Sequence, residues 1–120
     1  DCDASAAEIR AEIGKRCGKE VGVVINDSLG RAWRNGTEGT ALGAAGLEAL
    51  QDLRGAEDLF GRELRVTEVG FGDEIAAAAS LLQGQAAGSS PVVLVRGFDL
   101  GGRSRPARDL VRPKEMDLFR

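Results

Sequence analysis

A carboxylate and a hydroxyl stand side by side directly after a β-branched segment. Residues 21–25 read Val-Gly-Val-Val-Ile, and Asn26, Asp27 and Ser28 follow. Carboxylate and hydroxyl oxygens are hard ligands, which Mg²⁺ and Mn²⁺ prefer together with water and substrate phosphate. Because open α/β sheets bind ligands at the carboxyl ends of their strands, Asp27 and Ser28 suit a metal–nucleotide site. The alternative, which local chemistry favours, is a turn in which Asp27 bonds its own backbone.

Two arginines and the only tryptophan of the sequence follow within the next six residues. They are Arg31, Trp33 and Arg34. Guanidinium groups bind phosphates or carboxylates through paired hydrogen bonds, and an indole ring packs against planar rings or guanidinium groups. These residues are therefore candidates for substrate binding and catalysis. A surface ion-pair cluster around a buried tryptophan explains the same residues equally well, so both interpretations stay open.

The end of a helix further along the chain is a third candidate. Residues 81–88 contain Gly84, Gln85 and Gly88, whose flexible backbone could approach phosphate groups. A simple helix C-cap is the other interpretation, and the pattern alone favours it.

The composition excludes several common kinds of chemistry. The chain has no His, which removes Ser-His-Asp and Cys-His nucleophiles, and its two Cys are too few for a disulfide framework or a zinc site. Neither a P-loop nor a dinucleotide-binding glycine motif is present. Catalysis must therefore come from carboxylates, Lys, Arg, hydroxyls and a metal.

Charge and hydropathy limit the partners. The 120 residues include 16 Lys and Arg interspersed with 19 Asp and Glu, so the chain lacks the basic excess of a nucleic-acid surface. No apolar run approaches the length of a membrane span, and the first residues do not resemble a signal peptide. We therefore expect a soluble, cytoplasmic protein whose partners are small molecules or proteins.

Two helices are predicted to position these candidates. Ser5 and Glu8 fit a capping box, which predicts a helix from about residue 6 to about residue 16 that ends near Gly18. Asp73 is suited to cap a second helix, rich in Ala and Leu, that ends at Gly84.

The remaining segments are predicted as strands and loops. Apolar and β-branched residues favour strands over residues 21–25, 63–70 and 92–95. Five glycines between residues 29 and 46 predict a long functional loop, and the leucine spacing predicts a short helix over residues 47–53. From residue 99 onward, Gly, Arg and Pro indicate a path across the surface. The order of elements indicates an α/β fold with helices packed on a mixed sheet.

Four blocks of the sequence resemble the coenzyme F420-0:γ-glutamyl ligase family. Residues 21–36, VGVVINDSLGRAWRNG, resemble the family stretch VGVIISDTFGRPWRNG, and residues 60–67, FGRELRVT, resemble YGRELRVT. Residues 73–79 with Gly84-Gln85, and residues 91–97, are similar to its DEIAAAAELVMG and PVVxVRG blocks. The resemblance covers nearly all of residues 1–120. It identifies them as the C-terminal half of the ligase domain, one lobe of a two-lobed fold.

The resemblance implies roles for specific residues. Asp27 and Ser28 would bind a divalent metal, and Gln85 would reach the metal or a phosphate. GTP would contact the turn formed by Leu81, Leu82, Gln83, Gly84, Gln85, Ala86, Ala87 and Gly88. Position 28 is more often Thr in the family, and position 85 varies in charge. Arg31 and Arg34 are our own candidates for stabilising charge during catalysis.

The resemblance also implies a function. The expected enzyme is a homodimeric ligase that uses GTP, Mg²⁺ or Mn²⁺, and K⁺ to join L-glutamate to coenzyme F420-0 through an acyl phosphate. Because the N-terminal half would supply another metal-binding Asp and more of the GTP site, we expect residues 1–120 alone to be inactive. The alternatives are a noncatalytic dimerising fragment or degenerate paralogue, and a ligase of the same fold that acts on a different acid.

Overall fold

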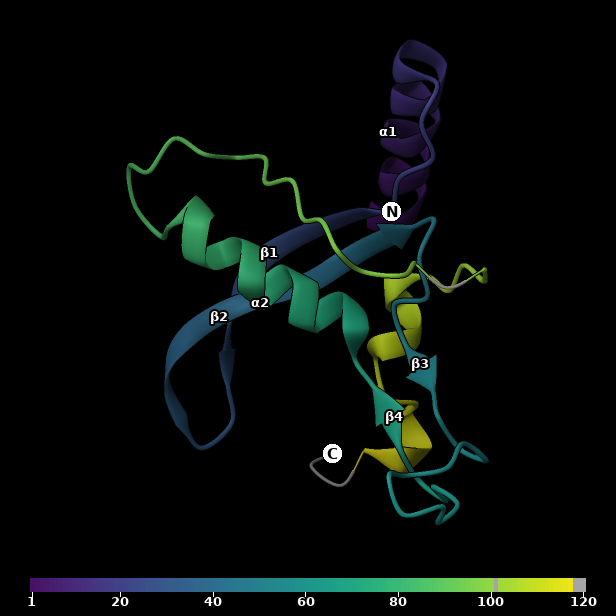
Figure 1. The fold of residues 1–120 in the computed structure, drawn as a ribbon. Helices are drawn as coiled ribbons and strands as arrows, with labels where there is room; N and C mark the ends of the chain where they lie inside the picture. The colour runs from purple at the N-terminus through teal and green to yellow at the C-terminus, as the bar shows by residue number, and fades with distance from the viewer. Residues whose placement is uncertain (101, 118–120) are drawn as a thin grey trace.

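The computed structural model describes residues 1–100 and 102–117 (Figure 1). Its helices are α1 (Cys2–Cys17), α2 (Phe71–Gln83) and the short 3₁₀ helices η1 (Ala107–Leu110) and η2 (Lys114–Met116). Its strands are β1 (Val23–Arg31), β2 (Arg34–Ala45), β3 (Gln51–Asp52) and β4 (Glu68–Val69), which form two antiparallel pairs, β1 with β2 and β3 with β4. The α/β class is confirmed. In these two ranges of residues, no helix is long and apolar enough to cross a bilayer.

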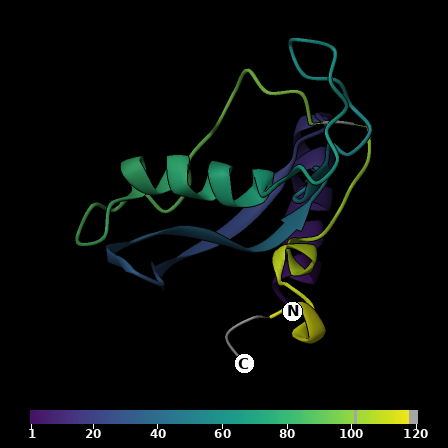
Figure 2. The ribbon, with the colours of Figure 1, turned by 90° about the horizontal axis from the view of Figure 1, so that it is seen from below.

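The hairpin of β1 and β2 is the largest feature of the fold. Its pairing runs from Val23 opposite Ala45 to Arg31 opposite Arg34, with irregularities after Ile25 and Gly30. Helix α2 lies across one face of the hairpin, and α1 stands at its open end (Figures 1 and 2). The hairpin therefore leaves one edge of β1 without a paired strand among the described residues.

β2 occupies most of the segment predicted as a long loop, so that prediction is wrong. The glycines of this strand have a packing role. A side chain at Gly39 would collide with the carbonyl oxygen of Ala76 in α2, and one at Gly43 would collide with the carbonyl oxygen of Cys2 in α1. These glycines let two helix backbones approach the strand closely, which is a recognised use of glycine within strands.

Helix α1 begins earlier than the capping box predicts. Asp1 caps it, because its Oδ1 accepts hydrogen bonds from the backbone N–H groups of Asp3 at 3.0 Å and Ala4 at 3.3 Å. Ser5 lies inside the helix, so the predicted cap is wrong. The predicted end is confirmed, because Gly18 is left-handed (φ 60°) and its N–H donates to the carbonyl of Gly14.

Helix α2 also begins before its predicted cap. It starts at Phe71, with Gly70 in the N-cap position. Asp73 instead accepts a hydrogen bond on Oδ1 from the backbone N–H of Ala41 at 2.9 Å, which fastens α2 to β2. The cap prediction is wrong, while the helix itself and its end at Gly84 are confirmed.

Three further predictions are wrong. Residues 47–53 are not a helix, because Leu47 is buried in the core and Gln51–Asp52 form β3. Of the strand predicted over residues 63–70, only Glu68–Val69 pairs with another strand. Residues 92–95 form no strand, since no strand of the described chain pairs with them, and the side chain of Val92 is 86% exposed.

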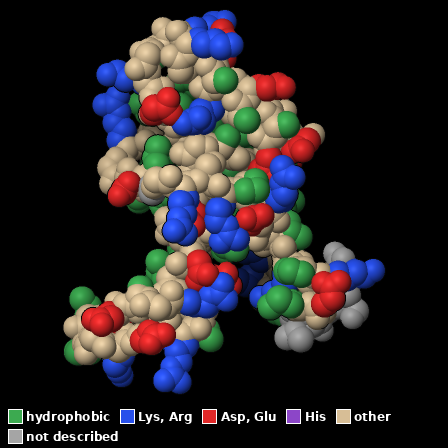
Figure 3. Space-filling model, turned by 90° about the vertical axis from the view of Figure 1, so that its right-hand side faces the viewer, with side chains coloured by type: hydrophobic (Ala, Val, Ile, Leu, Met, Phe, Trp, Pro, Cys, Tyr) green, Lys and Arg blue, Asp and Glu red, His purple; other side chains and the backbone are tan. Residues whose placement is uncertain are grey.

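The core is small and is built mainly from alanine. Leu47 is the only large side chain that is fully buried among the described residues. It packs with five alanines and one phenylalanine: Ala41, Ala44, Ala49, Ala76, Ala107 and Phe71. Large apolar side chains instead remain on the surface, and the face in Figure 3 shows hydrophobic side chains interspersed with charged ones.

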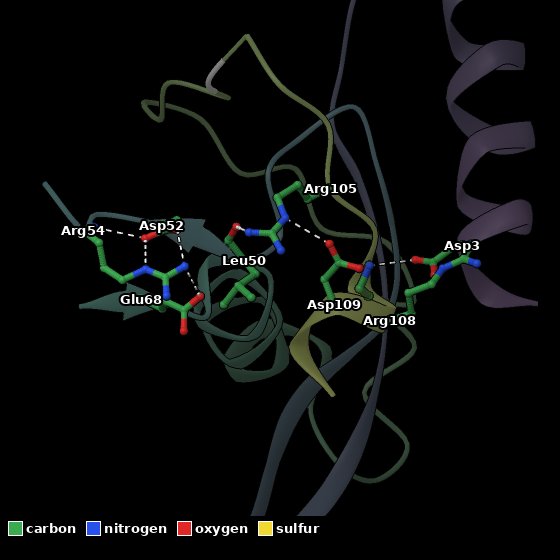
Figure 4. A network of polar contacts seen from close by, with 9 residues as sticks. Asp3, Leu50, Asp52, Arg54, Glu68, Arg105, Arg108 and Asp109 are labelled. Atoms are coloured by element: carbon green, nitrogen blue, oxygen red, sulfur yellow. Dashed lines mark hydrogen bonds and ion pairs between the residues drawn. The ribbon is translucent and has the colours of Figure 1, made fainter. Parts of the chain in front are cut away.

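A buried carboxylate joins the two ends of the chain. Asp3 Oδ1 accepts hydrogen bonds from the backbone N–H groups of Ala44 at 2.9 Å and Ala107 at 2.8 Å. Asp3 Oδ2 accepts one from Arg108 Nε at 3.1 Å (Figure 4). Burial raises the pKa of Asp3, but these hydrogen bonds together outweigh it and hold the pKa below its ordinary value. The surface path predicted from residue 99 onward is therefore wrong for η1, which is anchored to the core.

Candidate functional site

A cavity of about 760 Å³ runs along the unpaired edge of β1. Its walls come from α1, β1, α2 and the segment from Pro91 to Phe98. Apolar side chains line most of its length, among them Ile9, Ile13, Ile75, Ala79 and Val93. Polar side chains gather where β1 meets the end of α2, and these are Asn26, Asp27, Ser28, Ser80, Gln83 and Gln85. This combination of an apolar wall and a few polar groups is typical of small-molecule sites.

Asp27 and Ser28 lie within β1 and are therefore not in a turn. Asp27 pairs with Thr40 of β2, and Ser28 pairs with Gly39. The predicted turn is wrong, because the backbone of both residues is part of a strand. Asp27 Oδ1 does accept a hydrogen bond from the N–H of Ser28 at 2.7 Å. Asp27 is exposed, and its carboxylate forms no ion pair with the described residues. Its second oxygen is consequently available to a ligand.

The two side chains leave the strand on opposite faces. Successive residues of a strand alternate between its faces. Ser28 pairs with Gly39, over which α2 packs, so Ser28 shares that face and Asp27 takes the other. Both residues nevertheless line the cavity. A cation held by both must therefore lie beyond the edge of β1 and not above one of its faces.

The end of α2 is fastened to β1 by a pair of side-chain amides. Asn26 Nδ2 donates to Gln83 Oε1 at 2.8 Å, and Gln83 Nε2 donates to Asn26 Oδ1 at 3.2 Å. Gln83 Nε2 also donates to the carbonyl oxygen of Pro91 at 3.4 Å. Asn26 was not among the site residues predicted from the sequence, although a polar residue at the end of a β-branched run is a usable signal.

Only part of the predicted nucleotide-binding turn reaches the cavity. Gln83, Gly84 and Gln85 line it together with Asp27 and Ser28. The other five residues of the predicted set do not line it, and all five are exposed: Leu81, Leu82, Ala86, Ala87 and Gly88. The predicted metal residues and the end of α2 therefore line one cavity, whereas five of residues 81–88 do not line it.

The predicted arginines lie outside the cavity, at the turn of the hairpin. Arg31 forms an ion pair with Glu38 at 2.5 Å, whereas the guanidinium of Arg34 makes no hydrogen bond or ion pair with residues 1–100 or 102–117. A strand rises about 3.3 Å per residue, so at most about 13 Å of strand separates Asp27 from Arg31. Trp33 is 89% exposed, so the idea of a buried tryptophan is wrong.

The oxygen donors at the polar end fit Mg²⁺ or Mn²⁺. In the part of the chain that the structure describes, no group of three or more His, Cys, Asp or Glu residues could hold a metal. The available set is one carboxylate, one hydroxyl and one amide, from Asp27, Ser28 and Gln85. These are hard donors, and Mg²⁺ is commonly held by one or two carboxylates, with water and substrate phosphates completing its shell.

Comparison with known proteins shows the family to which the chain belongs. The F420-0:Gamma-glutamyl ligase family matches residues 1–97. The chain is 50% identical over 118 residues to the coenzyme F420:L-glutamate ligase of Methanocaldococcus jannaschii, covering 98% of this chain and 47% of that protein. It is 48% identical over 118 residues to the enzyme of that name from Methanococcus maripaludis strain C6, covering 98% and 48%. The corresponding match in Methanothermobacter thermautotrophicus is 43% identical over 125 residues, covering 100% and 48%. The chain thus spans about half the length of the curated relatives it matches.

Proposed function

Because the chain belongs to the F420-0:γ-glutamyl ligase family, we propose that it forms part of an enzyme that joins L-glutamate to coenzyme F420-0 at the expense of GTP. One observation of the structure carries most of this proposal. The cavity along β1 combines the oxygen donors of Asp27 and Ser28 with the helix end at Gln83 and Gln85. A metal–nucleotide complex requires such donors beside a stretch of accessible backbone.

The proposed reaction has two steps. A carboxylate oxygen of F420-0 attacks the γ-phosphorus of GTP, the bond to the bridging oxygen breaks, and GDP leaves. The amine nitrogen of glutamate then attacks the acyl carbon, inorganic phosphate leaves, and the nitrogen gives up a proton to water. An amide forms in place of one phosphoanhydride bond. A second glutamate, added through the γ-carboxylate of the first, would repeat the same two steps.

The residues of this chain have distinct roles in that reaction. Asp27, Ser28 and Gln85 would hold Mg²⁺ or Mn²⁺, which when bound offsets the negative charge of the phosphates. Gly84 exposes the backbone at the end of α2 to the nucleotide. Arg34, whose guanidinium has no partner among the described residues, is better suited than Arg31 to bind an anion, since Arg31 already pairs with Glu38.

The chain spans about half the length of its relatives, and the proposal includes what the other half supplies. A second carboxylate for the metal and further GTP contacts would come from that half, in a two-lobed subunit of a homodimer. A single carboxylate binds a divalent cation weakly, which supports a metal site shared between this chain and the other half of the protein. K⁺ would act as an additional activating cation.

A ligation assay tests the proposal. Full-length protein that contains these 120 residues is incubated with F420-0, L-glutamate, GTP, Mn²⁺ and K⁺, and the masses of the products are measured by mass spectrometry. We expect a product heavier by one or more glutamate residues, which is lost when GTP or Mn²⁺ is omitted and reduced without K⁺. Residues 1–120 alone should give no product, and adding the other half in trans should restore some.

Calorimetry separates the ligase from its rivals. A noncatalytic dimerising protein would show no Mn²⁺-dependent binding of GTP, and this result would remove the proposed function. Binding of GTP with Mn²⁺, but no product from F420-0, would instead indicate a ligase of the same fold for a different acid.

A further inference from the structure

The turn between β1 and β2 holds an exposed tryptophan in an unfavourable backbone conformation. Trp33 has φ 63°, in the left-handed region where glycine is favoured and bulky residues are uncommon. Its side chain is 89% exposed. The turn lies at the end of the hairpin that is remote from α1 (Figure 1). The largest side chain of the sequence therefore stands where the backbone disfavours it.

The packing of the described residues gains little from this side chain. Trp33 is not part of the buried cluster around Leu47, and its exposure leaves its ring without a packing partner in the described residues. Backbone conformations of this kind occur preferentially at functional sites. A large, rigid aromatic ring on the surface is also a common anchor for ligands.

The neighbouring charges indicate what kind of ligand fits. Arg31 is fixed by its ion pair with Glu38 on β2, which braces the end of the hairpin. Arg34 follows Trp33 directly, and its guanidinium has no hydrogen bond or ion pair within residues 1–100 and 102–117. The turn thus presents an indole ring beside an unengaged guanidinium. This pair suits a planar aromatic ring that carries an anionic substituent.

We propose that Trp33 stacks on the deazaflavin ring of F420-0 and that Arg34 binds its phosphodiester. This inference rests on the proposed function, because it takes F420-0 as the acceptor. F420-0 has its ring at one end and its reactive carboxylate at the other, with a ribityl chain and the phosphodiester between them. At most about 13 Å of strand separates Asp27 from the hairpin turn, so a single extended ligand can reach from the proposed metal site to the turn.

Substitution of Trp33 tests the stacking contact in the full-length protein. Trp33→Gly removes the ring and relieves the left-handed strain, so the thermal midpoint should stay unchanged or rise. Stacking of a base on an aromatic side chain is commonly worth a tenfold change in affinity, so F420-0 should bind at least about tenfold more weakly. Trp33→Phe should lose less. The difference in emission between wild type and Trp33→Phe isolates Trp33, and F420-0 should quench it.

Matched probes separate the two contacts. The deazariboflavin that lacks the phosphodiester should still depend on Trp33 but should bind equally well to wild type and Arg34→Gln. Phospholactate, which lacks the ring, should depend on Arg34 alone. Leu59→Ser serves as the control, because Leu59 is fully exposed on the β3–β4 loop, and it should leave F420-0 affinity unchanged.

Each remaining outcome decides the inference. If ligation proceeds but Trp33→Gly binds F420-0 within twofold of wild type, the inference fails while the proposed function stands. If F420-0 binds in a Trp33-dependent manner but GTP supports no ligation, the inference stands and the ligase function fails. If Trp33→Gly lowers the thermal midpoint by more than the added entropy of glycine in the unfolded chain explains, Trp33 contacts another protein surface and the inference fails. Absence of F420-0 binding by wild type overturns both.

Discussion

Asp3, in helix α1 at the open end of the hairpin, and Asp27, on strand β1, use their carboxylates differently. Asp3, at the open end, is buried and accepts hydrogen bonds from two backbone N–H groups and one guanidinium. Asp27, on the unpaired edge of β1, is exposed and accepts a single hydrogen bond from the adjacent residue. A carboxylate whose oxygens are fully engaged holds a fold together, whereas one with spare capacity can bind a ligand.

Removal of the Asp3 carboxylate should give the largest loss of stability. Asp3→Ala leaves the N–H groups of Ala44 and Ala107 without their acceptor and the Arg108 guanidinium without its partner. We expect the free energy of unfolding to fall by about 3 kcal/mol. Urea unfolding followed by circular dichroism measures it. A loss as small as that of Asp27→Ala would remove the contrast between the two carboxylates.

Two glycines of the hairpin show the same contrast between a packed and an open position. Gly39→Ala should lower the free energy of unfolding by about 2 kcal/mol, because the new Cβ collides with the backbone of α2. Gly30→Ala is the matched control, since no atom lies within 4 Å of its Cβ position. It should change stability by less than about 0.5 kcal/mol. If the two substitutions lowered the thermal midpoint equally, α2 would not pack closely against Gly39.

Asp27 should matter for turnover and not for folding. Asp27→Asn keeps the shape of the side chain but removes its charge from the proposed metal site. In the full-length protein we expect turnover at limiting Mn²⁺ to fall at least about tenfold. Ser28→Ala should cost less, because a neutral hydroxyl binds a hard dication more weakly. A folded Asp27→Asn enzyme with an unchanged Mn²⁺ requirement would exclude Asp27 from the site.

The smallest expected effect is a change in the pH dependence of stability. The hydrogen bonds to Asp3 hold its folded-state pKa below the ordinary value of 3.8. Its contribution is therefore complete above pH 3.8 and is lost as pH falls through the lower, folded-state pKa. The difference in unfolding free energy between wild type and Asp3→Asn should narrow in that acidic range. If the difference in unfolding free energy did not change with pH, the lowered pKa of Asp3 would be contradicted.

Features set by local interactions were predictable from the sequence. The ends of α1 and α2 follow from Gly18 and Gly84, and the helical composition of residues 73–82 indicates α2. The α/β class follows from these elements. Asp27, Ser28 and Gln85 were candidates by chemistry and resemblance, and the structure brings them to one cavity.

Features set by distant contacts were not predictable. The glycines of β2 look like loop residues until α1 and α2 are seen to pack against them. Ser5 fits a cap, but Asp1 provides one a turn earlier. The run at residues 92–95 has strand composition, yet a strand also requires a paired neighbour, which local sequence does not specify.

The Asp3 contact has a consequence for how the chain folds. The bond from Ala107 to Asp3 closes a loop of 104 residues, and the entropy lost in closing a loop grows with its length. The hairpin contact between Asp3 and Ala44 can form earlier, because it spans only 41 residues. On the ribosome, the first half of the chain must leave this carboxylate incompletely satisfied until residues 107 and 108 emerge. Closure at Asp3 is therefore a late step in the folding of this chain.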